Sequence, residues 1–202
     1  IVAALVKRKR FVYLCTNALL LEKKLALFTP SPYLTFSVHL DGLEEEHDRA
    51  VAQKGTFKRA VSAIRAARAK GFRVSVNSTW FNNAAPERVA AFLDFVRKEL
   101  NVEGVTLSPG YAYERASDQE HFLTRERTKE LFRDVFRLGR GKGWRFTQSS
   151  LFLDFLAGNQ SYRCTPWSNP TRNVFGWQRP CYLLNEGTAP SYSALMQETE
   201  WD

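Results

Sequence analysis

The sequence lacks the features that mark membrane-spanning and disulfide-rich proteins. Its 202 residues hold 3 cysteines, 1 methionine, 11 glycines and 8 prolines, and no apolar run reaches the length of about 20 residues that a spanning helix needs. This composition excludes an integral membrane protein, collagen and a disordered chain. The cysteines, Cys15, Cys164 and Cys181, are odd in number and widely spaced. They therefore favour a reducing, cytoplasmic location over a disulfide framework.

Well-known catalytic motifs are missing as well. The chain has no CxxC pair and no GxGxxG, GxxxxGK[ST], HExxH or GxSxG segment. It starts at Ile1, and its only methionine is Met196. We therefore expect a piece of a longer chain, with apolar edges exposed at both ends.

The charge is strongly basic. Lys and Arg number 29 against 21 Asp and Glu, which gives a net charge of +8. Most of these bases are spread along predicted helices, as on solvated faces, and only residues 7–10 and 137–142 form clusters. An alternative function is therefore a non-catalytic basic α/β module that binds nucleic acid or an anionic membrane through these clusters.

Strands and helices alternate along the first 143 residues. Amphipathic helices with apolar residues at a period near 3.6 separate β-branched and aromatic runs. This order predicts an α/β fold with a parallel sheet, either doubly wound or part of a barrel. The alternative is an antiparallel-like sheet with one wet face. We expect strands at residues 11–15, 34–40, 72–79 and 102–107, helices near residues 19–27, 44–48, 57–67, 86–100 and 131–136, and, from residue 144 to 202, a loop-rich aromatic extension with a short helix near 192–198.

Polar residues stand at the ends of all four predicted strands, where parallel α/β folds bind ligands. His39 could be a ligand contact or a hydrogen-bonded core residue, and Cys15 could face the site or be an inert buried thiol. His47 and His121 lie among charged neighbours, which predicts a surface position. The candidate site residues at or just past the strand ends are Cys15, Thr16, Asn17, Ser37, His39, Asp41, Asn77, Ser108, Tyr113 and Glu114.

Several segments carry a resemblance to a known family. LCTNA and HLDG resemble the third and fourth strands of the radical S-adenosylmethionine (SAM) barrel. More specific are FVYLCTNALLLEKK, SPGYAYERASDQEHFL and the long aromatic segment that starts at QSSLFLDFLAGNQSYRC. They resemble the hopanoid-biosynthesis radical SAM family, the adenosylhopane synthases, over essentially the whole chain.

The resemblance implies a reaction. A [4Fe-4S] cluster cleaves SAM to a 5′-deoxyadenosyl radical, which adds to the terminal alkene of diploptene and gives adenosylhopane. Cys15 matches a family cysteine that can donate the final hydrogen atom. The resemblance places contacts to the SAM ribose and adenine at Asn17, Ser37, Asp41, Asn77 and Ser108, with Thr16, His39, Tyr113 and Glu114 as further cofactor-binding candidates.

The resemblance also implies that the chain is a fragment. The family's CxxxCxxC loop and GGEP-like segment are expected before Ile1, so no metal ligand is assigned within the chain. Residues 1–143 would hold about strands three to six of the barrel, and residues 144–202 an incomplete family-specific extension. We expect this piece alone to be inactive.

Partners and location follow from the same resemblance. It implies a hopene-type lipid substrate, an electron donor such as flavodoxin or ferredoxin, and no nucleic acid. The location would be cytoplasmic, with peripheral contact to the inner membrane. A different adenosyl-radical reaction on the same scaffold is a further alternative, because fold and cofactor do not fix the substrate.

Overall fold

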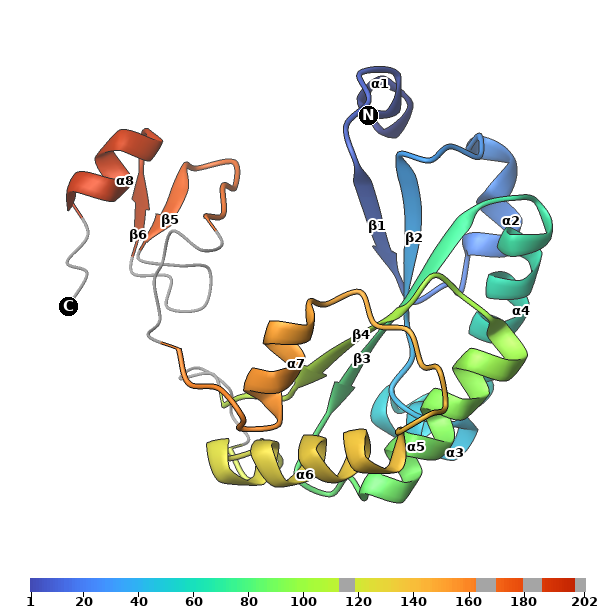
Figure 1. Ribbon diagram of the computed structural model, residues 1–202. Coiled ribbons are helices and arrows are strands. Elements are labelled where there is room, and N and C mark those ends of the chain that lie inside the picture. The colour runs from blue at the N-terminus through green and yellow to red at the C-terminus, as the bar shows by residue number, and fades with distance from the viewer. Residues whose placement is uncertain (113–118, 163–169, 180–186, 199–202) are drawn as a thin grey trace. The chain divides into compact units, whose positions relative to one another are not determined.

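The structure is a computed structural model that describes residues 1–112, 119–162, 170–179 and 187–198 (Figure 1). The described residues form two compact units, which we treat separately. The first runs from Ile1 to Gln160, and the second holds the described residues from Ser161 onward. The predicted boundary after residue 143 is not where the compact units divide.

The first unit is built on a four-stranded parallel sheet, as predicted. Its strands lie in the order β1-β2-β3-β4, and every neighbouring pair is parallel. The antiparallel alternative is therefore wrong. The predicted bounds are close for the first three strands, while the fourth starts three residues later than expected. The strands are β1 (Val12–Thr16), β2 (Leu34–His39), β3 (Arg73–Trp80) and β4 (Val105–Pro109).

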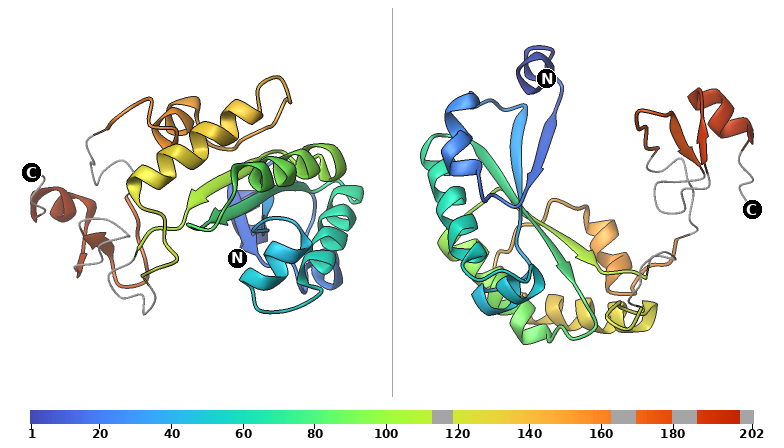
Figure 2. Two further views of the ribbon diagram at one scale, coloured as in Figure 1. Left: turned by 90° about the horizontal axis from the view of Figure 1, so that it is seen from below. Right: turned by 180° about the vertical axis from the view of Figure 1, so that it is seen from behind.

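Helices connect the strands. Two of them, α4 (Thr56–Ala69) and α5 (Pro86–Phe95), lie on the same side of the sheet (Figures 1 and 2). The apolar period of α4 is read correctly from sequence, since Phe57, Ala60 and Ile64 are all buried. Pro86 opens α5, as its fixed backbone angle favours at a first helical position. The helices of this unit are α1 (Val2–Lys7), α2 (Leu21–Lys24), η1 (Leu25–Leu27), α3 (Glu44–Ala50), α4 (Thr56–Ala69), α5 (Pro86–Phe95), η2 (Val96–Leu100), α6 (Arg125–Leu138) and α7 (Ser150–Leu156).

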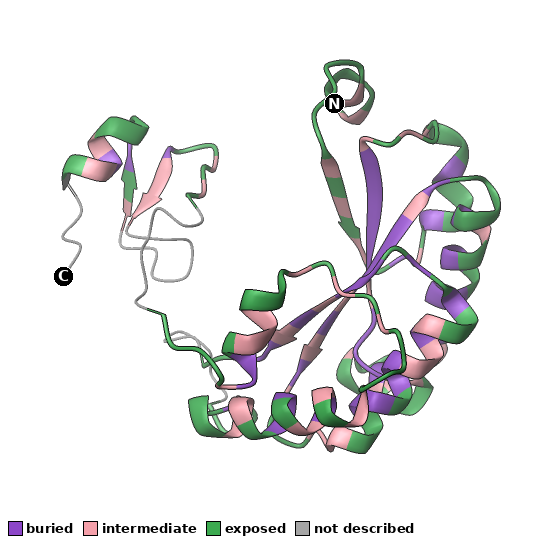
Figure 3. Cartoon of the chain, in the orientation of Figure 1, coloured by how far each residue is buried: buried purple, intermediate pink, exposed green. Residues whose placement is uncertain are grey.

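The hydrophobic core lies between the sheet and these helices (Figure 3). Phe36, Val76 and Leu107 point from three neighbouring strands to the helical side and are fully buried. Trp80 at the end of β3 packs edge-on against Phe92 of α5, with ring centroids 5.6 Å apart. Because side chains alternate along a strand, the other face of the sheet carries the remaining, mostly polar positions.

The sheet continues past β4 in a segment that we predicted to be part of a loop-rich extension. Phe146 forms a parallel bridge with Val105, and the N–H of Thr147 donates to the Val105 carbonyl at 3.0 Å. The side-chain amide of Gln148 then bonds both backbone groups of Leu107, at 2.8 and 2.6 Å. We did not predict this pairing, because so short a segment leaves almost no periodic signal.

The second unit contains a small antiparallel pair, β5 (Trp177–Arg179) and β6 (Gly187–Ala189), followed by α8 (Tyr192–Glu198). The helix confirms the expectation for residues 192–198. We did not predict the two strands, since three residues are too few to show alternation.

Apolar side chains are exposed at the first strand. Phe11 and Tyr13 are 71% and 60% exposed, and β1 pairs with β2 alone among the described strands. This agrees with the expected apolar edge. None of the described helices is long and apolar enough to cross a membrane.

Gln148 closes the exposed edge of β4, so its loss should destabilise the first unit. We expect Gln148→Leu to lower the free energy of unfolding by about 2 kcal/mol, because both backbone groups of the buried Leu107 lose their partner. Urea titration followed by circular dichroism measures the change. The matched control is Gln53→Leu at an exposed loop position between α3 and α4, which should change stability little. Equal stability of the two variants would show that the Gln148 bonds contribute nothing.

Candidate functional site

A polar surface covers the sheet face opposite the helices. The strand register brings its residues into rows that cross the sheet. We call this set the polar face. Its rows are Cys15, Ser37 and Ser75, then His39, Asn77 and Thr106, and finally Thr79 and Ser108 at the carboxyl ends of β3 and β4.

The polar face includes small hydroxyl and amide side chains at different depths. Ser37 and Ser75 are buried, whereas Asn77, Thr106 and Ser108 are half-buried, and Cys15 is exposed with a free thiol. Hydroxyls and amides both donate and accept hydrogen bonds. The polar face can therefore hold a ligand that is rich in hydroxyl groups and ring nitrogens.

Asp41 lies just beyond β2 and ties two strand ends together. Its Oδ1 accepts the backbone N–H of Thr79 at 2.7 Å, and its Oδ2 lies 2.6 Å from Nε2 of His39. The carboxylate is 8% exposed, so both of its oxygens are engaged with the protein itself. The hydrogen bond between His39 and Asp41 raises the pKa of His39 above its usual value, although partial burial opposes the effect.

His47 of α3 stabilises this arrangement through a hydrogen bond to the backbone of Asp41. We predicted a surface residue, but the structure buries it to 1% exposure, so the prediction was wrong. Its Nδ1 accepts the backbone N–H of Asp41 at 3.1 Å, which keeps the proton of the neutral ring on Nε2. Burial lowers the pKa of His47, so the neutral form that this bond needs is favoured. The charged neighbours in sequence concealed this role, because they gave no sign that His47 itself is buried.

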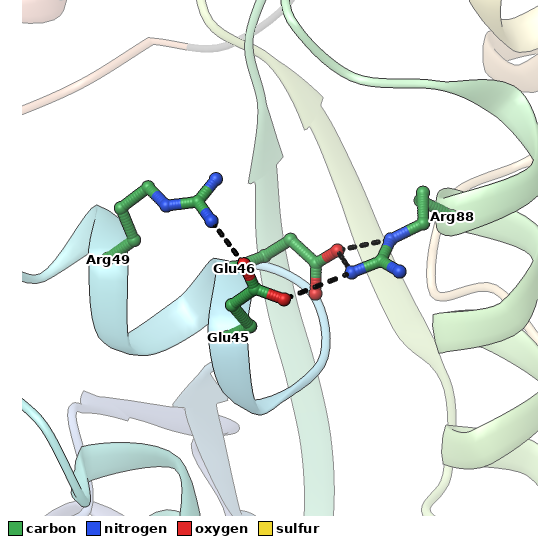
Figure 4. A network of polar contacts seen from close by, with 4 residues as sticks. All are labelled: Glu45, Glu46, Arg49 and Arg88. Atoms are coloured by element: carbon green, nitrogen blue, oxygen red, sulfur yellow. Dashed lines mark hydrogen bonds and ion pairs between the residues drawn. The ribbon is translucent and has the colours of Figure 1, made fainter.

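Gly42 and an ion-pair network hold the segment that follows. Gly42 has φ +102°, and a side chain there would come within 2.7 Å of Cβ of Glu46, so the turn requires glycine. Arg88 in the first turn of α5 pairs with Glu46 and approaches Glu45 of α3, while Arg49 bonds Glu45 at 2.5 Å (Figure 4). The network links α3 to α5 next to the ends of β2 and β3.

The structure brings some of the predicted site residues together and leaves others apart. Ser37, His39, Asn77 and Ser108 share the polar face with Cys15. Thr16 belongs to the alternate row of β1, and its hydroxyl accepts the N–H of Ala18 at 3.0 Å. The side chain of Asn17 similarly accepts the N–H of Leu19 at 3.2 Å, so both residues shape the turn after β1. Tyr113 and Glu114 lie outside the described residues.

Sequence reasoning missed Thr106 of the polar face and its neighbour Thr147. Thr106 stands beside Asn77, and its hydroxyl lies 2.6 Å from that of Thr147 in the segment beside β4. The alternation of Thr106 with Ser108 could have revealed the first. Nothing in the sequence marks Thr147, because the pairing of its segment with β4 was not predicted.

A metal-ligand set is a separate question. Within the described ranges, no three His, Cys, Asp or Glu side chains come together in a way that could hold a metal ion. His39, Asp41 and His47 are near one another, and their contacts use Nε2 of His39, both Asp41 oxygens and Nδ1 of His47, while Nε2 of His47 is buried without a hydrogen-bond partner. The described residues therefore do not fit a metal cluster.

Two protein-family models together match nearly all of the chain. Residues 1–96 match the radical SAM superfamily, and residues 105–202 match a family described as a domain of unknown function, DUF3463. No curated protein is similar enough to the chain to count as a relative.

Solved structures share the fold. Native anSMEcpe with bound AdoMet and the Cp18Cys peptide is 14% identical with a TM-score of 0.62, over 93% of this chain and 57% of that one. SuiB of Streptococcus suis bound to S-adenosylmethionine is 13% identical with a TM-score of 0.55, over 74% of this chain and 35% of that one. The chain thus spans 57% of the length of the first protein and 35% of the second.

The four-stranded parallel sheet agrees with these likenesses in fold, and the radical SAM match covers β1 to β3 and the helices between them. Residues 1–96 therefore match a radical SAM domain, and residues 105–202 match the separate DUF3463 family.

Proposed function

We propose that this chain belongs to a radical SAM enzyme that adds the 5′-deoxyadenosyl group to the terminal alkene of diploptene and forms adenosylhopane. The polar face carries the proposal, because it offers hydroxyl and amide groups next to an exposed thiol on one side of a parallel sheet. The reaction and its substrate come from the sequence resemblance. The partners would then be a hopene-type lipid and a flavodoxin- or ferredoxin-like electron donor.

The adenosyl half of SAM is the part that the polar face suits. Asn77 and Ser108 lie on neighbouring strands and are half-buried, so they remain accessible to ribose hydroxyls or the adenine edge. Ser37 lies deeper in the same face. Asp41 acts differently in this proposal: its oxygens are engaged, so it positions His39 and the end of β3 and does not itself contact the nucleoside.

The [4Fe-4S] cluster of this enzyme class supplies the electron that cleaves SAM. Since the described residues hold no ligand set for it, we assign no residue of this chain to the cluster. The contribution of this chain is to bind the adenosyl group, to orient it, and to provide a hydrogen atom.

Cys15 is the proposed hydrogen donor. Addition of the adenosyl carbon to the alkene forms one carbon–carbon bond and leaves an unpaired electron on the tertiary carbon. The S–H bond of Cys15 then breaks, its hydrogen atom completes the product, and a sulfur-centred radical remains. One electron from the external donor and one proton return the sulfur to the thiol. The exposed thiol beside Ser37 supports this role.

Asp41 should matter for SAM affinity although it makes no direct contact. We expect Asp41→Asn in the full-length, cluster-loaded protein to weaken SAM binding about tenfold in equilibrium dialysis. An amide cannot accept hydrogen bonds from both Thr79 and His39 in the present geometry. The control is Asp134→Asn on α6, a half-buried residue paired with Arg137 and far in sequence from the strand ends. Unaltered SAM affinity in a folded Asp41→Asn protein would contradict the positioning role.

The pair of His39 and Asp41 also predicts a pH dependence of stability. Because the folded-state pKa of His39 is raised, protonated His39 stabilises the protein below about pH 6.5, and this contribution is lost as the pH rises through the raised pKa. We therefore expect the stability difference between wild type and His39→Asn to be larger at about pH 5.5 than at about pH 8.5. Guanidinium unfolding at both pH values measures it. A difference that grows with pH would refute the account.

The role of Cys15 as hydrogen donor can be tested separately from SAM cleavage. We expect Cys15→Ser in the full-length protein to form 5′-deoxyadenosine and methionine but little adenosylhopane, since an O–H bond is too strong to replace the S–H bond. Liquid chromatography with mass spectrometry measures both products. Tyr13→Phe is the control, because Tyr13 is exposed on the same face two residues away. Normal adenosylhopane yield in Cys15→Ser would rule out the donor role.

A further inference from the structure

The second unit carries a tightly formed turn at residues 172–177, which we call the apolar turn. Arg172 and Trp177 form an antiparallel bridge across its base, and the N–H of Asn173 donates to the Gly176 carbonyl at 2.9 Å. The side chain of Asn173 also accepts the N–H groups of Phe175 and Gly176, at 2.8 and 3.2 Å. The conformation of the turn is therefore defined by its own hydrogen bonds.

Glycine is required at the end of this turn. Gly176 has φ +146°, and a side chain there would come within 2.6 Å of the Ala189 carbonyl oxygen on β6. The close approach of β6 fixes the base of the turn, while its apex is left free of such packing.

The apex presents two apolar side chains to solvent. Val174 and Phe175 are 89% and 82% exposed, which is unusual for large apolar residues on a turn that is otherwise well ordered by hydrogen bonds. An exposed pair of this kind marks an interaction site more often than a scattered single residue does.

The surroundings of the apex favour a lipid surface. Trp177 packs against Tyr192 with ring centroids 5.2 Å apart, and these are the two aromatic residue types that membrane interfaces enrich. Arg172 is exposed next to the apex. Residues 170–179 include two Arg residues and no Asp or Glu, so this described segment complements anionic headgroups.

A protein partner fits less well. Stable protein interfaces bury about 1,600 Å² and present a broad patch or a groove. Two side chains on the apex of a turn offer far less area, but they are suited to enter the boundary between headgroups and acyl chains.

We propose that the apolar turn is a membrane-interface anchor that inserts Val174 and Phe175 into an anionic bilayer while Arg172 meets the lipid phosphates. This inference is independent of the SAM chemistry proposed above, since it rests on the second unit alone. It is also distinct from the basic clusters at residues 7–10 and 137–142.

Vesicle co-sedimentation of the full chain tests the anchor. The vesicles are phosphatidylcholine with about 30% phosphatidylglycerol, and contain no hopene, so substrate binding cannot contribute. We expect wild-type protein to bind them, and the double variant Val174→Ser, Phe175→Ser to bind about tenfold more weakly. Arg172→Gln should reduce the preference for these vesicles over pure phosphatidylcholine. Leu27→Ser, at a residue of the first unit that is 75% exposed, is the matched control and should bind as wild type does.

Three results would overturn the proposal. The first is absence of wild-type binding to anionic vesicles, and the second is equal binding by wild type and the double variant. The third is binding that is lost only when the charges at residues 7–10 are removed, which would assign the contact to that basic cluster. In the second case, a changed oligomeric state of the double variant in analytical ultracentrifugation would show that the apolar turn is a protein contact.

Discussion

The carboxylate of Asp41 is the constraint on which the candidate site depends. It joins the end of β2 to the end of β3 through the Thr79 N–H, and it holds His39 at the edge of the polar face. A buried carboxylate needs such partners, because an unpaired buried charge is costly. His47 completes the arrangement by accepting the N–H of Asp41, and Gly42 lets the chain turn directly into α3. The short segment from His39 to His47 thus combines strand pairing, a turn and a helix start.

The remainder of the site follows from the parallel sheet. Alternation sends Phe36, Val38 and Val76 into the helical core and sends Ser37, His39 and Asn77 to the opposite face. The two faces have opposite requirements, since one is stabilised by burial of apolar area and the other must keep polar groups accessible. The same strands therefore build the core and the polar face together.

Much of this arrangement could be predicted from sequence, because it follows from the local spacing of apolar and polar residues. The alternation of polar and apolar residues along 34–39 and 73–79 indicates one polar face, and the spacing of Phe57, Ala60 and Ile64 indicates the buried side of α4. What could not be predicted depends on contacts between distant segments. His47 has charged neighbours in sequence, yet tertiary packing turns it toward Asp41. Residues 145–148 are too short to show a strand period, and only pairing with β4 defines them. Tyr113 and Glu114 lie outside the described residues, so their predicted contact with the cofactor stays a prediction.

The central claim is that the polar face binds the adenosyl group of SAM. A crystal structure of the full-length protein with its cluster and SAM bound tests this most directly. We predict that the nucleoside lies against the polar face, with Asn77 and Ser108 within hydrogen-bond distance of its ribose or adenine and with the Asp41 carboxylate still bound to Thr79 and His39. A nucleoside bound away from β2, β3 and β4, or one coordinated directly by Asp41 after its bonds to Thr79 and His39 have broken, would contradict the account.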